Sequence, residues 1–144
     1  MVGLVLDQRR GEDVSTDYGR TVELGTPFDA TLARVREVLA EQGFGVLTEI
    51  DVAATLKAKL GEDMEPYVIL GACNPPLAHR ALEADRSIGL LLPCNVVVRG
   101  AGDGGSVVQA LDPQTMVKLT RLPAMEPVAD EAGRRLNAAL DALG

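Results

Sequence analysis

Residues 26–50, TPFDATLARVREVLAEQGFGVLTEI, decide the fold, because they predict one long helix followed directly by a strand. The opening TPFD supplies a capping hydroxyl at Thr26, a proline in the first helical position and an acid in the first turn. Apolar residues then recur at helical spacing, at Phe28, Leu32, Val35, Val38 and Leu39. Gly43 predicts a left-handed helix end, and residues 44–50 follow as a strand.

The segments around this unit predict further strands. Residues 18–24 predict a strand before the helix. Residues 88–98 form the most apolar run, and residues 106–111 return from it through the glycine-rich turn GAGDGG at 100–105. Two strands joined by a tight turn pair as an antiparallel hairpin. Pro93, inside the apolar run, predicts an edge position or a bulge, because proline cannot donate to the strand ladder.

Helices are predicted between and after these strands, with one more apolar strand at residues 67–70. Three short helices begin at the capping residues Asp51, Asn74 and Asp112. A long final helix carries one apolar face, formed by Val128, Ala132, Leu136, Leu140 and Leu143. The predicted order is β-α-β-(α)-β-(α)-β-β-(α)-α. The fold class is therefore α+β, a mainly antiparallel sheet covered by two long helices.

Length and composition limit the domain organisation. The 144 residues predict one domain. We expect a flexible leader at residues 1–16 and a single α+β domain at residues 17–144. Because only 3% of the residues are aromatic, the core must be aliphatic. No Gly-x-Gly-x-x-Gly sequence joins a strand to a helix, so a dinucleotide-binding sheet is not predicted.

The charge and the cysteine content exclude several classes of partner. The net charge of −7 argues against nucleic acid, because duplex binders cluster Lys and Arg against the phosphates. The longest apolar run is too short to span a bilayer, so no membrane partner is predicted. Two cysteines in a chain of this length do not form a disulfide framework, and we expect a cytoplasmic protein.

Several segments resemble one known family in the same order along the chain. They are GFGVLTEIDV at residues 43–52, PYVILGACNP at 66–75, IGLLLPCNVVV at 88–98 and the pair Asp112-Pro113. Over about residues 17–143 the chain resembles the domain of unknown function 302 family. The resemblance implies a compact α+β fold similar to one half of the TATA-binding-protein-like architecture, and a homodimer. It implies neither DNA binding nor an established activity from which a cofactor would follow.

The candidate functional residues lie in a repeated dipeptide, Cys73-Asn74 and Cys94-Asn95. Cys73 ends a predicted strand just before a helix, whose N-terminal N–H groups would stabilise a thiolate. If the strands of Cys73 and Cys94 are neighbours, the two thiols meet. Two interpretations stay open. Together with His79 the thiols bind a soft metal or carry out redox chemistry, or both cysteines pack as small apolar side chains.

Other polar residues near the dipeptides allow more than one role. Asn74 is explained as a helix cap. Asn95 lies in an apolar strand, so its amide must satisfy backbone groups left open by Pro93 or face a ligand. Glu49 and Asp51 lie on one face of a strand end, where paired carboxylates would allow acid–base catalysis. Asp51 also serves as a cap, however, and Glu49 as a solvated surface residue.

These patterns define no reaction. The leading hypothesis is a non-catalytic homodimeric module that binds a small molecule or a protein, using an apolar pocket between sheet and helices. The candidate ligand-binding residues are Cys73, Asn74, Cys94, Asn95 and Glu49. The alternative is a thiol-based metal-binding or redox protein, with Cys73, Cys94 and His79 as candidate metal ligands. An enzyme that uses Glu49 or Asp51 is the third hypothesis.

Overall fold

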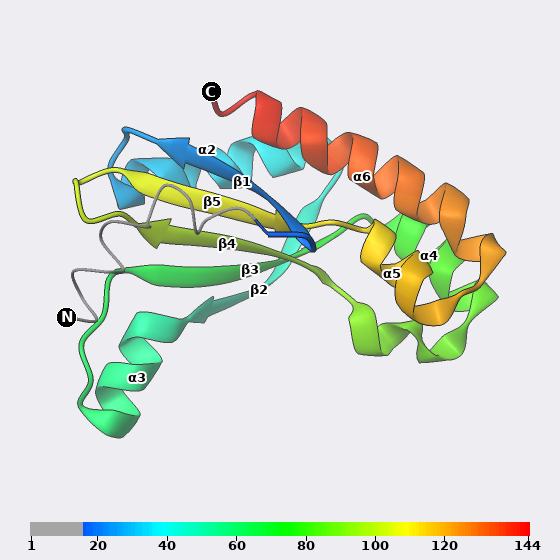
Figure 1. The fold of residues 1–144 in the computed structure, drawn as a ribbon, viewed down its shortest axis with the longest axis horizontal. Coiled ribbons are helices and arrows are strands. Elements are labelled where there is room, and N and C mark those ends of the chain that lie inside the picture. The colour runs from blue at the N-terminus through cyan, green and yellow to red at the C-terminus, as the bar shows by residue number, and fades with distance from the viewer. Residues whose placement is uncertain (1–15) are drawn as a thin grey trace.

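The structure is a computed structural model that describes residues 16–144. The leader expected at residues 1–16 therefore lies outside the described residues except for Thr16. The described chain forms one five-stranded sheet with the order β1-β5-β4-β3-β2, in which every neighbouring pair is antiparallel (Figure 1). The strands are β1 Gly19–Leu24, β2 Gly45–Asp51, β3 Tyr67–Cys73, β4 Cys94–Gly100 and β5 Ser106–Leu111.

Two long helices, α2 (Phe28–Glu41) and α6 (Glu126–Asp141), lie on the same face of the sheet (Figure 1). Shorter helices occupy the connections: α3 Val52–Leu60, α4 Pro75–Ala84, η1 Arg86–Leu91, α5 Gln114–Thr120 and η2 Pro123–Met125. The α+β class, the antiparallel sheet, the two long covering helices and the predicted order of elements are confirmed. Within residues 16–144, no helix is both long and apolar enough to cross a membrane.

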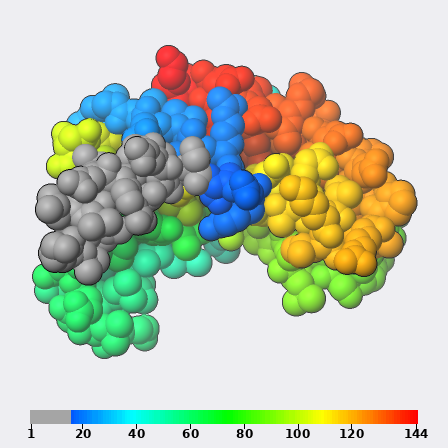
Figure 2. Space-filling model, in the orientation of Figure 1, coloured from blue at the N-terminus to red at the C-terminus, as the bar shows by residue number. Residues whose placement is uncertain are grey.

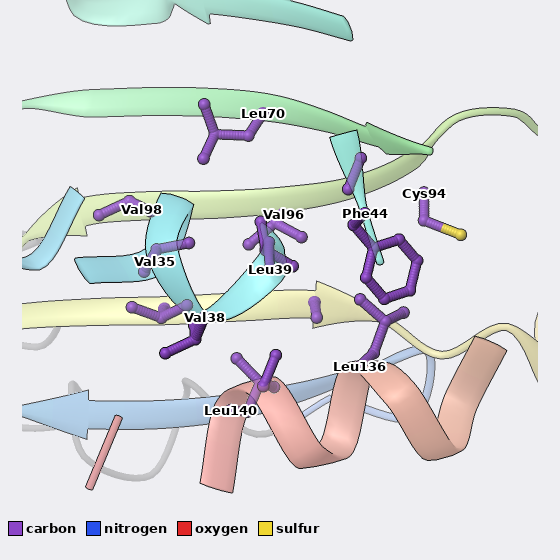
Figure 3. Packing of buried hydrophobic residues seen from close by; sticks show 14 of the residues in the cluster. Val35, Val38, Leu39, Phe44, Leu70, Cys94, Val96, Val98, Leu136 and Leu140 are labelled. Atoms are coloured by element: carbon purple, nitrogen blue, oxygen red, sulfur yellow. The ribbon is translucent and has the colours of Figure 1, made fainter. Parts of the chain in front are cut away.

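The first core cluster lies between the sheet and the two long helices. Val35, Val38 and Leu39 of α2 and Leu136 and Leu140 of α6 are buried against the central strands (Figure 3). Val68, Leu70, Val96, Val98 and Val108 supply the sheet side of this cluster. These strand residues alternate along each strand, because successive side chains point to opposite faces of a sheet. The other face is therefore lined by the remaining strand residues and is covered by neither long helix.

A second core cluster lies beyond the end of the sheet. It joins Leu77 and Ala81 of α4, Ile88 of η1, Met116 of α5, Met125 of η2, and Val128, Ala129 and Ala132 of α6. The first half of α6 packs in this cluster, whereas its second half packs on the sheet. One helix thus bridges both clusters.

The prediction of a strand over residues 88–98 is wrong in its first half. Residues 86–91 form the 3-10 helix η1, whose start is capped by Asp85, with its carboxylate accepting from the Ser87 N–H at 2.9 Å. The strand begins at Cys94, directly after Pro93, and lies between β3 and β5 rather than at an edge. Apolar residues are buried in a packed turn as well as in a strand, so hydrophobicity alone does not separate the two.

The start of α2 also differs from the predicted cap. Pro27 occupies the capping position without a side-chain hydrogen bond, and the Thr26 hydroxyl lies 2.7 Å from the hydroxyl of Thr31. The Thr26 carbonyl accepts a hydrogen bond from the Ser106 hydroxyl at 2.7 Å, which ties the helix start to β5. The predicted helix end is confirmed, because Gly43 has a left-handed φ of 83°.

Candidate functional site

Cys73 and Cys94 lie on neighbouring strands at the end of the sheet. In the antiparallel register of β3 and β4, Ala72 pairs with Cys94, so Cys73 is one residue beyond that pair. Both cysteines line one cavity between the sheet end and the helices α4, α5 and α6. Phe44 closes the side of this cavity next to Cys94 (Figure 3). The strands of Cys73 and Cys94 are therefore neighbours, which is the condition that the sequence analysis set for the two thiols to meet.

The cavity at the two cysteines is small. Its volume is about 30 Å³, and its walls are almost entirely apolar, with Leu77, Met116 and Val128 among them. Pockets that enclose organic ligands usually measure about 300–1,000 Å³. The expected apolar pocket between sheet and helices is thus present, but in this conformation it has room for no more than a water molecule or a methyl group.

The two thiols have different surroundings. Cys94 is only 7% exposed, and burial, followed by the nearby Cys73, raises the pKa of its thiol to about 11. Burial raises the pKa because removal from water disfavours the charged thiolate. At neutral pH Cys94 is therefore a protonated, apolar side chain. Cys73 is half-buried and precedes the N-terminus of α4.

The Asn74 amide is hydrogen-bonded locally at both of its ends. Its side-chain oxygen accepts from the backbone N–H of Leu77 at 3.2 Å, which caps α4. Its side-chain nitrogen donates to the carbonyl of Gly43 at 3.2 Å, at the turn between α2 and β2. A Cβ atom at Gly43 would lie 3.0 Å from this nitrogen. The Asn74 amide thus links the start of α4 to the turn between α2 and β2.

His79 and the carboxylates are not brought to the cysteines. The His79 side chain is exposed on α4, where its Nδ1 lies 3.3 Å from a Glu83 oxygen. Glu49 on β2 forms an ion pair with Arg36 of α2, and Asp51 accepts from the Ala54 N–H at 2.9 Å as the cap of α3. Within the described part of the chain, no group of three or more His, Cys, Asp or Glu residues is arranged to hold a metal ion.

Asn95 is separated from Cys94 by the alternation of β4. Cys94 is buried on the helix side, whereas Asn95 is exposed on the opposite face. It lines a depression on that face, which we call the open-face hollow, with a volume of about 490 Å³. The hollow is lined by Thr16, Tyr18, Gly19, Tyr67, Asn95, Val97, Arg99, Gln109, Ala110 and Leu111. The repeated dipeptide therefore does not form one patch.

The open-face hollow differs from another large depression in how its polar groups are used. A depression of about 610 Å³ between α4 and α6 contains Asn74, Glu131 and Arg135. Arg135 donates to Glu131 at 2.6 Å and to the Gln42 carbonyl at 3.0 Å, so these groups already have partners. In the open-face hollow, by contrast, the side chains of Asn95 and Arg99 form no hydrogen bond or ion pair with any described residue.

Sequence reasoning missed Arg99 and the two tyrosines of the hollow. The signal was the alternation within β4, in which Asn95, Val97 and Arg99 share one face and Cys94, Val96 and Val98 share the other. Placing the start of this strand too early obscured that alternation. Tyr18 lies directly before β1 and Tyr67 is the first residue of β3. Only the order of the strands in the sheet brings them to the same hollow.

A five-stranded antiparallel sheet with two long helices on one face defines a two-layer α+β protein, with one layer of sheet and one of helices. The chain belongs to the family named domain of unknown function DUF302, whose model matches residues 20–143. It is similar to the crystal structure of an uncharacterized conserved DUF302 protein from Bacillus stearothermophilus, with 34% sequence identity and a TM-score of 0.82. That match covers 90% of this chain and 100% of the other. No curated protein matches the sequence significantly.

Proposed function

We propose that the protein is a non-catalytic, homodimeric module that binds a small molecule in the open-face hollow. The observation that carries the proposal is a hollow of about 490 Å³ in which the polar side chains of Asn95 and Arg99 stand beside apolar Val97 and Leu111. Small-molecule sites combine apolar walls with a few polar groups that orient the ligand. This choice keeps Asn95 as a ligand-binding residue and assigns Cys73, Asn74, Cys94 and Glu49 to packing, capping or ion pairing.

Filling the hollow tests this proposal. In Val97→Trp the indole would occupy the middle of the hollow, and we expect this variant to lose fragment binding observed by amide chemical shifts along β3, β4 and β5. Leu119→Trp adds the same ring at an exposed position of α5, outside the hollow, and should bind like the native protein. Fragments that shift none of the hollow residues, or that bind Val97→Trp equally well, would remove the support for this site.

The second copy of the homodimer is proposed to pair along β2. This strand is an edge of the sheet, and its Leu47 and Ile50 are 67% and 49% exposed. An edge strand with exposed apolar side chains is a template for another strand. Its Glu49 is neutralised by Arg36, and its other carboxylate, Asp51, lies at the last residue of the strand as the cap of α3. Figure 2 shows the molecular outline notched between α3 and the segment containing η1, and β2 lies toward this notch in Figure 1.

Two leucines of similar exposure provide the test of the homodimer. Leu47→Lys places a charge on the β2 edge, and we expect it to convert a dimer into a monomer in native mass spectrometry and light scattering. Leu119→Lys, on α5 at 63% exposure, should leave the dimer intact. A native protein that is monomeric at tens of micromolar, or a dimer that survives Leu47→Lys, contradicts pairing along β2.

A thiol-based function is the second candidate, because both cysteines line the same cavity on neighbouring strands. Cys73 would react first, and its sulfur would then join that of Cys94 in a disulfide. Hydrogen peroxide would accept the two electrons and both thiol protons and become water. Rapid alkylation of Cys73 in the native state, and a disulfide lost in both Cys73→Ser and Cys94→Ser, would favour this function. Labelling of both thiols only after unfolding would exclude it.

Four further expectations complete the proposal. A cytoplasmic location fits two thiols that are not paired in a disulfide. Nucleic acid is not proposed as a partner, because the chain is acidic and its Lys and Arg residues form no run. We retain a TATA-binding-protein-like architecture and a single domain at residues 17–144. Support for that architecture comes from the long helix after the first strand and the long helix after the last, which cover the same face.

A further inference from the structure

Arg99 stands at one end of the open-face hollow. It lies on β4 opposite Tyr67 of β3 and Val107 of β5, on the same face as Asn95 and Val97. Arg99 is half-buried, so part of the residue packs against its neighbours on the sheet. A charge beside a concave, partly apolar wall is screened less than a charge on a flat surface.

The charge of Arg99 has no counterpart in the described structure. Several other cationic residues form ion pairs with described acids, namely Arg20, Arg36, Lys57, Arg134 and Arg135. Arg99 forms none with residues 16–144, and no Asp or Glu is among the described residues that line the hollow. The nearest acid in register is Glu23 of β1, because Val107 of β5 pairs with Arg99 on one side and with Glu23 on the other. Two strand spacings place the backbone of Glu23 about 10 Å from that of Arg99. The hollow is therefore locally positive on a chain whose net charge is −7.

The remaining groups of the hollow are neutral and arranged in order along β4. Val97 follows Asn95 by two residues and precedes Arg99 by two, so the Cα atoms of Asn95 and Arg99 lie about 13 Å apart along the strand. Between these ends the surface is apolar at Val97, and two tyrosine rings, Tyr18 and Tyr67, also line the hollow. Along β4 the hollow therefore presents a cation at Arg99, an apolar surface at Val97 and an amide at Asn95.

We infer that the open-face hollow is selective for an organic anion, a carboxylate carried on an apolar body, whose charged group binds Arg99. The inference rests on the binding function proposed above and names its class of ligand. A guanidinium matches a carboxylate with two parallel hydrogen bonds, and such charge-assisted bonds are about twice as strong as neutral ones. The apolar body would lie on Val97 and between the tyrosines, and Asn95 would meet a polar group at the far end.

Three probes of similar shape but different charge test whether the hollow selects its ligand by charge. They are 3-phenylpropionate, its neutral amide 3-phenylpropionamide and the cation 3-phenylpropylamine, each titrated into isotopically labelled full-length protein at low ionic strength. We expect the carboxylate to bind about tenfold more tightly than the amide and the amine to bind most weakly. The shifted amides should lie on β3, β4 and β5 around the hollow.

The variants Arg99→Gln and Arg99→Lys assign the charge to one residue. Arg99→Gln should bind the carboxylate and the amide equally, with the affinity for the amide unchanged. Arg99→Lys should keep part of the preference, because it retains the charge without the paired hydrogen bonds. Arg80→Gln is the control: Arg80 is exposed and, like Arg99, has no ion pair with any described residue, but it lies outside the hollow and should have no effect.

The outcomes distinguish this inference from the proposed function. Equal affinity of native protein for carboxylate and amide, with shifts at the hollow, overturns the anion selectivity and leaves the binding function standing. A carboxylate preference that survives Arg99→Gln overturns the role of Arg99. If none of the three probes shifts the hollow residues at millimolar concentration, the binding function and the inference that rests on it both fail.

Discussion

Two copies of the same dipeptide meet opposite surroundings in this protein. Cys73-Asn74 lies at the junction of β3 and α4, where Asn74 is buried and both ends of its amide are hydrogen-bonded. Cys94-Asn95 opens β4, where the strand alternation buries the thiol and exposes the amide to the open-face hollow. The comparison teaches that residue type sets what a side chain can do, whereas the local backbone decides which partner it meets.

The largest difference is expected between the two thiols at high pH. Burial and then Cys73 raise the pKa of Cys94 from 9.0 to about 11, so the unfolded chain loses this proton first. Stability linked to the proton is complete below pH 9 and is lost as pH rises from 9 to 11, by about 2–3 kcal/mol. Urea unfolding should show that Cys94→Ala loses less stability than the native protein over this interval.

Cys73→Ala is the matched control for the pH experiment, because Cys73 is only half-buried. Its unfolding free energy should keep most of the native decline between pH 9 and pH 11, because burial is the larger cause of the raised Cys94 pKa and Cys73 the smaller one. An identical decline in native protein and Cys94→Ala would mean that the buried thiol is not the group responsible.

The next effect separates the two asparagines. Asn74→Ala leaves the Leu77 N–H and the Gly43 carbonyl without their partner, and we expect a loss of about 2 kcal/mol in the free energy of unfolding. Chemical denaturation at neutral pH measures it. A loss below about 0.5 kcal/mol would show that water replaces the amide at both sites.

The partner of Asn74 provides an effect of similar size at the same junction. Gly43→Ala adds a Cβ atom at a φ of 83°, 3.0 Å from side-chain nitrogens of Asn74 and Arg135. The left-handed backbone alone costs about 1–2 kcal/mol for a residue with a Cβ. Gly61→Ala, also at a positive φ but with open space around it, isolates the contribution of the backbone. Equal losses in both variants would mean that the two nitrogens move aside freely.

The smallest effect is expected at the second asparagine. Asn95→Ala removes an exposed side chain that has no hydrogen bond to the described residues, so stability should change by no more than about 0.5 kcal/mol. Binding at the hollow should weaken if Asn95 orients the ligand. A destabilisation comparable with that of Asn74→Ala would erase the contrast between the two dipeptides.

Much of the fold could be predicted from periodicity and capping. The spacing of Val35, Val38 and Leu39 defined α2, and the capping residues Asp51 and Asn74 marked the starts of α3 and α4. Failure came at residues 88–93, where an apolar segment is buried in a 3-10 turn. Such a segment has the composition of a buried strand, and only the surrounding helices decide which conformation packs better.

The candidate site could be predicted only in part. The sequence left open whether Cys73 and Cys94 are close, because it did not fix which strands are neighbours, and the pairing of β3 with β4 decides it. The volume of the cavity between them could not be predicted, because it depends on how side chains from five elements fill the space. The grouping of Asn95 with Arg99 and Tyr67 requires the strand order and the exact start of β4, which are properties of the whole sheet.

The position of α6 across both core clusters has a consequence for how the chain acquires its structure. Val128 and Ala132 complete the cluster beyond the sheet, and Leu136 and Leu140 complete the cluster on the sheet. Because α6 follows every strand in the chain, neither cluster can close on the ribosome until this helix has been synthesised and released from the exit tunnel. The part of the sheet's apolar face that α6 covers must therefore wait exposed, which makes that interval the point at which a chaperone has most to protect.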